Sequence, residues 1–257
     1  LGQDYLKAGL LDRAEDAFNR LEQSSYAGGA LRHRLEIAQM VRDWPLAIDL
    51  AERLGRDTRE SMSHEIAHFR CELAVRALQD HQPDRLEVAV REVDAAARSA
   101  PDHPRPMLLA GEIALEQEDP AGAVSLWDAV AASHPAYLAL VAAGWLKAHA
   151  LIDEGERGIK VLEGVHRDHP SVDTLTAIAD AKLAAHGLEV ALTWAESALR
   201  ESPSLLGLEK LLSLRAIQAD GEEREEIEMS QRLLKPQAQR LARFACSRCG
   251  FKARSHY

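Results

Sequence analysis

Apolar residues recur three and four positions apart along most of this chain, which is the spacing of side chains on one face of an α-helix. Four prolines interrupt that pattern at nearly equal distances. Pro101, Pro135, Pro170 and Pro203 are separated by 34, 35 and 33 residues. Because proline cannot continue a helix, each of these positions predicts a helix end. The sequence therefore predicts helical segments that repeat about every 34 residues.

A common triplet of small and apolar residues precedes each proline. A small residue is followed four positions later by an apolar one, and three positions after that by another small or apolar residue. The triplets are Ala89, Val93 and Ala96; Ala123, Trp127 and Val130; Gly158, Leu162 and Val165; and Ala191, Ala195 and Ala198. This spacing puts three side chains on one face, where the small residue lets a neighbouring helix approach closely. One helix pair cannot bury such a face by itself, so we expect successive pairs to stack.

These repeats resemble the tetratricopeptide repeat. The matching residues are Leu1, Gly2, Tyr5, Ala14 and Phe18 in a first copy, Leu35, Ala47 and Ala51 in a degenerate second copy, and Gly111, Ala123, Trp127 and Pro135 in a later one. The resemblance implies an all-α fold, a right-handed superhelix (α-solenoid) of helix pairs over residues 1–203. Because Leu1-Gly2 matches the middle of a repeat's first helix, we expect the first repeat to be truncated at its N-terminus.

The segments after the repeats carry a different pattern. Residues 204–243 predict two further helices that cap the stack, with a break between them at Gly221. Residues 244–257 contain the motif Cys246-Ser247-Arg248-Cys249-Gly250 and predict the first half of a rubredoxin-like metal knuckle. We therefore expect three parts: repeats, capping helices and knuckle.

The composition agrees with a helical protein and limits its environment. Only 5% of the 257 residues are aromatic, while Ala and Leu are abundant, which favours helix over sheet. No apolar run is long enough to cross a bilayer, and the first residues lack the pattern of a signal peptide. We expect any membrane anchor to lie outside this sequence. The three cysteines do not make a disulfide framework and indicate a reducing compartment.

Charge is distributed unevenly along the chain. The net charge is −10, yet Met229 to Tyr257 contains seven basic residues and no acidic one. The acidic body repels nucleic acid, whereas this basic tail could attract RNA. Binding of RNA through the tail is one alternative function, but only Phe244, Phe251 and Tyr257 could stack on bases there, so we expect no nucleic acid partner.

The pair Cys246 and Cys249 is the first candidate chemical site. Two cysteines two residues apart, followed by Gly250, form a turn whose thiolates can converge on one metal ion. A tetrahedral site needs four ligands. His256 could supply a third ligand, but we expect a second Cys-x-x-Cys beyond Tyr257 to complete the site. Four thiolates accept iron or zinc. The alternatives are a redox pair or two free thiols.

The run His64-Glu65-Ile66-Ala67-His68 is the second candidate, because it matches the H-E-x-x-H pattern of zinc proteases. Cys71 would lie on the same helix face as both histidines. Glu65 would then be the general base of a zinc hydrolase. The short motif arises easily by chance, and no further ligand motif follows it. We therefore interpret His68, Phe69 and Cys71 as packing residues and His64 as a residue near a solvated helix start, and we assign no catalytic residue.

The combination of these repeats with a basic cysteine knuckle is similar to the bacterial lipopolysaccharide assembly protein B family. The segments that carry this resemblance are Leu1-Gly2-Gln3-Asp4-Tyr5, Ala8-Gly9-Leu10, Asp12-Arg13-Ala14-Glu15-Asp16, Glu65-Ile66-Ala67-His68-Phe69 and Cys71-Glu72-Leu73-Ala74. The resemblance implies an N-terminal membrane anchor and a C-terminal site with two cysteine pairs, of which Cys246 and Cys249 match the first.

The resemblance also implies a function. Family members are non-enzymatic adaptors on the cytoplasmic side of the inner membrane that restrain lipopolysaccharide synthesis. They promote degradation of the deacetylase LpxC by the membrane protease FtsH, and they act alongside other lipopolysaccharide assembly factors. The sequence leaves the oligomeric state open, a homodimer included.

Overall fold

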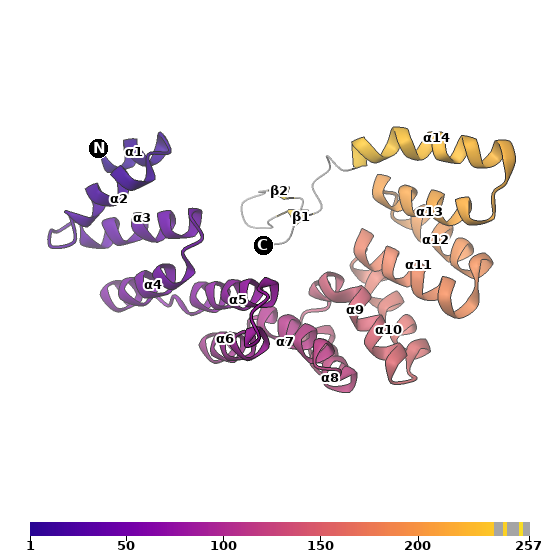
Figure 1. Cartoon of the computed structure of the whole chain (residues 1–257), viewed down its shortest axis with the longest axis horizontal. Coiled ribbons are helices and arrows are strands. Elements are labelled where there is room, and N and C mark those ends of the chain that lie inside the picture. The colour runs from indigo at the N-terminus through magenta and orange to yellow at the C-terminus, as the bar shows by residue number, and fades with distance from the viewer. Residues whose placement is uncertain (239–243, 246–251, 254–257) are drawn as a thin grey trace. The chain divides into compact units, whose positions relative to one another are not determined.

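A computed structural model describes residues 1–238, 244–245 and 252–253 of the chain (Figure 1). The chain divides into two compact units, Leu1–Gln117 and Glu118–Tyr257. In the part of the chain that the structure describes, each unit is built mainly of helices that pack against their neighbours along the sequence. Among the described residues, no helix is both long enough and apolar enough to span a membrane.

The first unit is a series of helix pairs. Its helices are α1 (Gly2–Lys7), α2 (Leu11–Asn19), α3 (Ala27–Met40), α4 (Trp44–Thr58), α5 (Ser63–Gln79), α6 (Arg85–Ser99) and α7 (Pro104–Glu116). Short connections turn the chain back after each helix, so α1 packs on α2, α3 on α4, and α5 on α6. One apolar cluster joins α3, α4 and α5 through Leu35, Leu50 and Phe69. A second joins α5, α6 and α7 through Cys71, Val93 and Ile113.

The second unit repeats this arrangement. Its helices are α8 (Pro120–Ser133), the 3₁₀ helix η1 (Pro135–Val141), α9 (Ala142–Leu151), α10 (Gly155–Asp168), α11 (Val172–His186), α12 (Leu188–Glu201), α13 (Leu205–Gln218) and α14 (Gly221–Ala238). In Figure 1 these helices follow one another from magenta to yellow. Strands β1 (Phe244–Ala245) and β2 (Lys252–Ala253) pair antiparallel, with Phe244 opposite Ala253.

The repeat predicted from the prolines and triplets is confirmed. Pro101, Pro170 and Pro203 each lie two residues after the last residue of a helix, and Pro135 begins η1. Of the triplet residues, all are buried except Val165, which is half-buried while the adjacent His166 is buried instead. The first repeat copy also needs a small residue where its two helices meet. A Cβ atom added at Gly2 of α1 would lie 2.8 Å from the ring of Phe18 in α2, which is too close. The all-α tetratricopeptide fold class is therefore confirmed.

Most turns inside a helix pair use a left-handed backbone conformation. The residues at these turns include Gly9 and Arg42 in the first unit and Asp153 and Gly187 in the second, with φ of 72°, 58°, 59° and 87°, whereas the turn between α5 and α6 has no such residue. Only glycine adopts this conformation without a steric penalty. Arg42 and Asp153 therefore each accept about 1–2 kcal/mol of strain, and the packing of the helix pairs they join outweighs it.

The terminal part of the chain is described only in part. Helices α13 and α14 pack on each other within the predicted capping segment 204–243. Cys246 and Cys249 lie in the sequence between β1 and β2, outside the described residues. The knuckle, and the boundaries predicted for the three parts, stay predictions.

Candidate protein-binding site

The H-E-x-x-H residues lie on α5, and their surroundings confirm the packing interpretation. The His64 side chain is 58% exposed at the helix start, with its Nε2 3.3 Å from Asp102 Oδ1. His68 instead contacts the Arg105 guanidinium of α7, with 2.7 Å between His68 Nδ1 and Arg105 Nη1. Cys71 is fully buried, and burial raises the pKa of its thiol to about 12, so it stays protonated and does not suit a cation. No group of three or more His, Cys, Asp or Glu suited to a metal ion occurs among the described residues.

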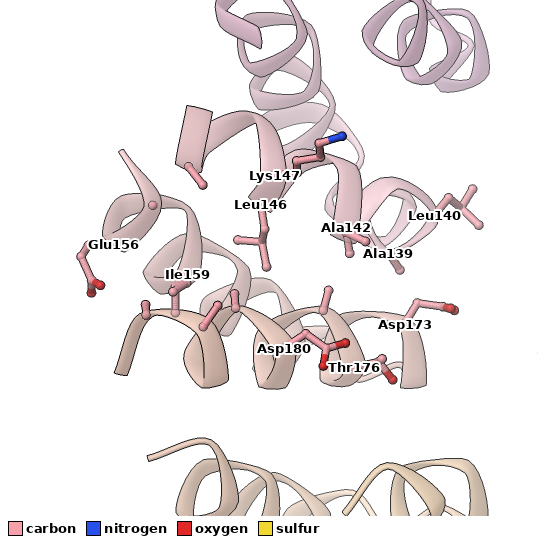
Figure 2. A pocket seen from close by; sticks show the side chains of 17 residues that line it. Ala139, Leu140, Ala142, Leu146, Lys147, Glu156, Ile159, Asp173, Thr176 and Asp180 are labelled. Atoms are coloured by element: carbon pink, nitrogen blue, oxygen red, sulfur yellow. The ribbon is translucent and has the colours of Figure 1, made fainter. Parts of the chain in front are cut away.

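A groove in the second unit is the candidate binding surface. It has a volume of about 620 Å³ and is lined by η1, α9, the start of α10, and α11. Its apolar floor contains Leu146 of α9, Ile159 of α10 and Ala177 of α11, all buried. Figure 2 shows Leu146 pointing from α9 toward α11, with charged residues around the margin of the groove. The groove is wide because alanines rather than larger side chains line most of both helices.

The charged margin of the groove is mostly acidic. Glu156 lies at one end of the groove, near the C-terminal end of α11. Its Oε1 is 3.0 Å from Nε2 of His186, the last residue of that helix. Asp173 lies at the opposite end, in the first turn of α11. Asp180 lies between them and forms an ion pair with Lys210 of α13. Lys147 of α9 is the lining residue with a positive side chain.

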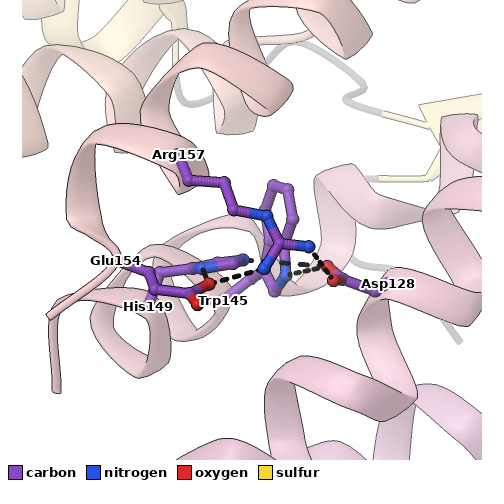
Figure 3. Close-up of polar contacts among 5 residues, drawn as sticks. All are labelled: Asp128, Trp145, His149, Glu154 and Arg157. Carbon is purple, nitrogen blue, oxygen red and sulfur yellow. Dashed lines mark hydrogen bonds and ion pairs between the residues drawn. The ribbon is translucent and has the colours of Figure 1, made fainter. Parts of the chain in front are cut away.

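A polar network behind α9 fixes the position of one groove wall (Figure 3). Asp128 of α8 accepts hydrogen bonds from Trp145 Nε1 at 3.2 Å and from Arg157 Nη2 at 3.1 Å. Arg157 of α10 also donates to Glu154 Oε2 at 2.5 Å. The network therefore joins α8, α9 and α10, and it holds Trp145, which is not among the residues that line the groove.

His149 lies buried inside this network. Its Nε2 is 3.7 Å from Asp128 Oδ1 and its Nδ1 is 3.7 Å from Glu154 Oε2, and neither ring nitrogen forms a hydrogen bond. Its ring packs edge-on against Trp145, with centroids 4.8 Å apart. Burial lowers the pKa of His149, and the nearby Asp128 carboxylate opposes that shift without cancelling it. The imidazole is therefore neutral at pH 7 and acts as a packing residue.

A second histidine fixes the other wall of the groove. His166 of α10 is buried, and its Nδ1 lies 2.7 Å from the Thr174 hydroxyl of α11. Ser171 caps α11 by accepting a hydrogen bond from Thr174 N at 3.1 Å. Burial also lowers the pKa of His166. The start of α11 is thus fixed to α10, which positions the alanines of α11 opposite α9.

Sequence reasoning missed both histidines and the groove itself. The only available signal was the i, i+4 spacing of Trp145 and His149. The groove depends on α9 and α11, whose facing residues are about thirty positions apart, and no motif marks it. Trp127, by contrast, belongs to the second triplet of the repeat pattern and is fully buried as that pattern predicts, and Trp145 is fully buried as well.

Comparison with known proteins gives a consistent answer over the whole chain. No family model matches. The lipopolysaccharide assembly protein B of Escherichia coli strain K12 is 27% identical over 259 aligned residues, which include 100% of this chain. The chain is similar along its entire length to lipopolysaccharide assembly protein B. It spans 66% of the length of that relative, so it corresponds to a part of it.

A second protein of this name and several solved structures also match. Lipopolysaccharide assembly protein B of Haemophilus influenzae is 26% identical over 138 residues, 53% of this chain and 34% of that protein. Among solved structures, Pseudomonas aeruginosa pilF matches 85% of this chain and 95% of its own, with a TM-score of 0.47 and 16% identity. Yeast Tom70 matches 89% of this chain and 47% of its own, with a TM-score of 0.49 and 16% identity.

Proposed function

We propose that this chain is part of a non-enzymatic adaptor that binds other proteins during lipopolysaccharide assembly. The observation that carries the proposal is the similarity to lipopolysaccharide assembly protein B over the whole chain. Stacked helix pairs present many exposed side chains on a preformed surface, which suits protein binding. The groove between α9 and α11 supplies one such surface.

The more specific proposal concerns the partners. The adaptor brings the deacetylase LpxC to the membrane protease FtsH at the cytoplasmic face of the inner membrane, which limits lipopolysaccharide synthesis. Such an adaptor raises the local concentration of one protein near another and needs no chemistry of its own. A scaffold held by buried networks such as that around Asp128 fits this role, because a preformed surface loses little entropy on binding.

We also propose that Cys246 and Cys249 supply two of the four thiolates of an iron or zinc site. The spacing of the two cysteines and the glycine after them support this proposal. Bound metal would order the end of the chain, because metal binding and folding are coupled. Metal content of the purified full-length protein tests it: we expect one iron or zinc ion per chain, lost in the variant Cys246→Ser/Cys249→Ser, whereas equal metal in both proteins would contradict it.

The half-life of LpxC in the host cell tests the adaptor function. Depletion of the full-length protein should lengthen that half-life several-fold, and re-expression should restore it. In a purified system, the protein should accelerate loss of LpxC in the presence of FtsH and ATP, with FtsH alone as the control. An unchanged LpxC half-life in depleted cells, together with no acceleration in the purified system, would rule the adaptor function out.

A further inference from the structure

The groove between α9 and α11 carries charge at its two ends and apolar surface between them. Asp173 marks one end, at the start of α11, and Glu156 marks the other, beside His186 at the end of α11. The separation along α11 is thirteen residues, which corresponds to about 20 Å at the helical rise. Figure 2 shows the two carboxylates at opposite ends of the groove, with Leu146 and Ile159 nearer its middle.

The carboxylate at the Glu156 end of the groove is only partly neutralised within the chain. Glu156 is 72% exposed, and its partner His186 is charged only when protonated. Asp180, midway along the groove, already forms an ion pair with Lys210 and therefore adds little net charge. Lys147 is the single cationic lining residue, on the α9 side. A ligand that lies along the groove consequently meets a carboxylate near each end and a small-residue apolar channel in between.

The walls of the groove restrict the kind of polypeptide it can hold. Both walls are α-helices, whose backbone groups are already hydrogen-bonded within α9 and α11. An extended peptide would find no free strand edge to pair with, so its backbone would depend on side chains and water for hydrogen bonds. A helix satisfies its own backbone. The alanines, among them Ala177 and Ala181, leave room for large side chains from such a helix.

We propose that this groove binds a basic amphipathic helix of a partner protein. The helix carries large aliphatic residues at i, i+3 or i+4, and i+7, and a Lys or Arg near each end of a stretch of about thirteen residues. The aliphatic side chains fill the channel beside Leu146, and the end cations pair with Glu156 and Asp173. This inference rests on the proposed function, since it names the partner segment that an adaptor of this kind would grip.

Synthetic peptides test the proposal directly. A fluorescent peptide of about 15 residues with a leucine stripe and two lysines at each end is titrated with the purified protein, and anisotropy gives Kd. We expect it to bind at least about tenfold more tightly than the same peptide with glutamates in place of the lysines. Raising the salt concentration should weaken binding of the lysine peptide and not of the glutamate peptide, because salt screens the pairing of the end lysines with Glu156 and Asp173.

Two groove variants with matched controls locate the binding site. Ala184→Leu narrows the channel at an exposed position of α11 and should weaken binding about tenfold or more, whereas Ala129→Leu, at an exposed position of α8 outside the groove, should leave Kd unchanged. Glu156→Gln should weaken binding of the lysine peptide severalfold, while Glu222→Gln in α14 should not. Circular dichroism confirms that each variant folds.

Several results would overturn the proposal. These are equal affinity for the two peptides, unchanged Kd in Ala184→Leu, and no binding by the folded wild-type protein. If Ala184→Leu instead converts a dimer into a monomer in ultracentrifugation, the occupant is a second copy of the chain. If the peptide binds only after residues 239–257 are deleted, the occupant is the chain's own basic tail. If the Ala184→Leu variant accelerates LpxC loss as fully as the wild type, the adaptor function stands and only the proposal that this groove binds the partner helix is rejected.

Discussion

Gly158 of α10 lies directly against the ring of His149 of α9. A Cβ atom added at Gly158 would stand 2.9 Å from both Cβ and Cγ of His149, closer than real side chains approach. The absence of a side chain at residue 158 is therefore what allows α9 and α10 to pack at their observed distance. This contact explains the small residue that begins the third triplet of the repeat pattern.

Gly158→Ala should consequently destabilise the protein, although alanine favours helix more than glycine does. The buried imidazole is held between Asp128 and Glu154 and has little freedom to move. We expect a loss of about 1–3 kcal/mol in the free energy of unfolding, measured by urea titration. Gly164→Ala in the same helix is the control, since nothing lies within 4 Å of the added atom, and it should stabilise by about 0.5–1 kcal/mol. Equal changes in the free energy of unfolding for Gly158→Ala and Gly164→Ala would contradict the close contact between Gly158 and His149.

The buried state of His149 predicts a loss of stability in mild acid. Burial holds its pKa below the usual value of 6.5, although Asp128 and Glu154 pull it upward and Arg157 pulls it down. The unfolded chain therefore takes up a proton near pH 6.5 that the folded chain does not bind, so stability is present above that pH and is lost as the pH falls below it. His166, whose pKa burial also lowers, adds a loss of the same sign.

His149→Phe should remove one part of this acid sensitivity. Between pH 7.5 and 5.5, the free energy of unfolding of the wild type should fall more steeply than that of the variant, by up to about 1.4 kcal/mol per pH unit. Urea midpoints measured across this range provide the test. Parallel curves for the two proteins would show that His149 takes up its proton over the same pH range in the folded and the unfolded state, which would contradict the lowered pKa.

The left-handed turn residue Arg42 offers a stabilising substitution. Its φ of 58° suits glycine better than arginine, and its side chain is exposed. Arg42→Gly should stabilise the protein by up to about 1 kcal/mol, seen as a higher Tm. Arg76→Gly, at an exposed position inside α5, should cost about 1 kcal/mol instead. A lower Tm for both variants would argue against the turn geometry.

Much of the fold could be predicted from sequence because the repeat depends on residues that lie close together along the chain. Proline positions and small residues three and four apart encode helix ends and contact faces directly, and eleven of the twelve triplet residues are buried. The exception is informative. Val165 was predicted on the contact face, but His166 is buried beside it, because Thr174 in the next helix supplies a hydrogen bond that sequence spacing does not reveal.

The groove and its supporting network could not be predicted in the same way. Asp128 and Trp145 are seventeen residues apart, and Asp128 and Arg157 twenty-nine, so their contacts depend on how three helices pack. Glu72 and Arg105 likewise meet across thirty-three residues. The H-E-x-x-H motif is the reverse case, in which a local sequence match is misleading. Its residue His68 contacts the Arg105 guanidinium, and among the described residues no third side chain joins the two histidines as a metal ligand.

The ion pair of Arg105 with Glu72 joins α7 to α5 in a mostly buried setting, with side chains 13% and 19% exposed. Glu72→Leu and Arg105→Met should each cost about 2–4 kcal/mol, because each leaves the other charge without its partner. The double variant should cost clearly less than the sum, with a coupling of at least about 1 kcal/mol in thermal unfolding. The exposed pair Arg32 and Glu60 is the control, and its coupling should stay below about 0.5 kcal/mol. Similar couplings in the two pairs would indicate that Arg105 and Glu72 are as solvated as the surface pair.

Site-specific photo-crosslinking tests most directly whether the second unit grips its partner through the groove. A photoreactive amino acid is placed at Lys147, at the margin of the groove, or at Ala129, on α8 outside it, in the full-length protein in its host. We expect a crosslink from position 147 to LpxC or FtsH, and none from position 129. Crosslinks to these proteins from position 129 alone, or from neither position while LpxC degradation still depends on the protein, would contradict the account.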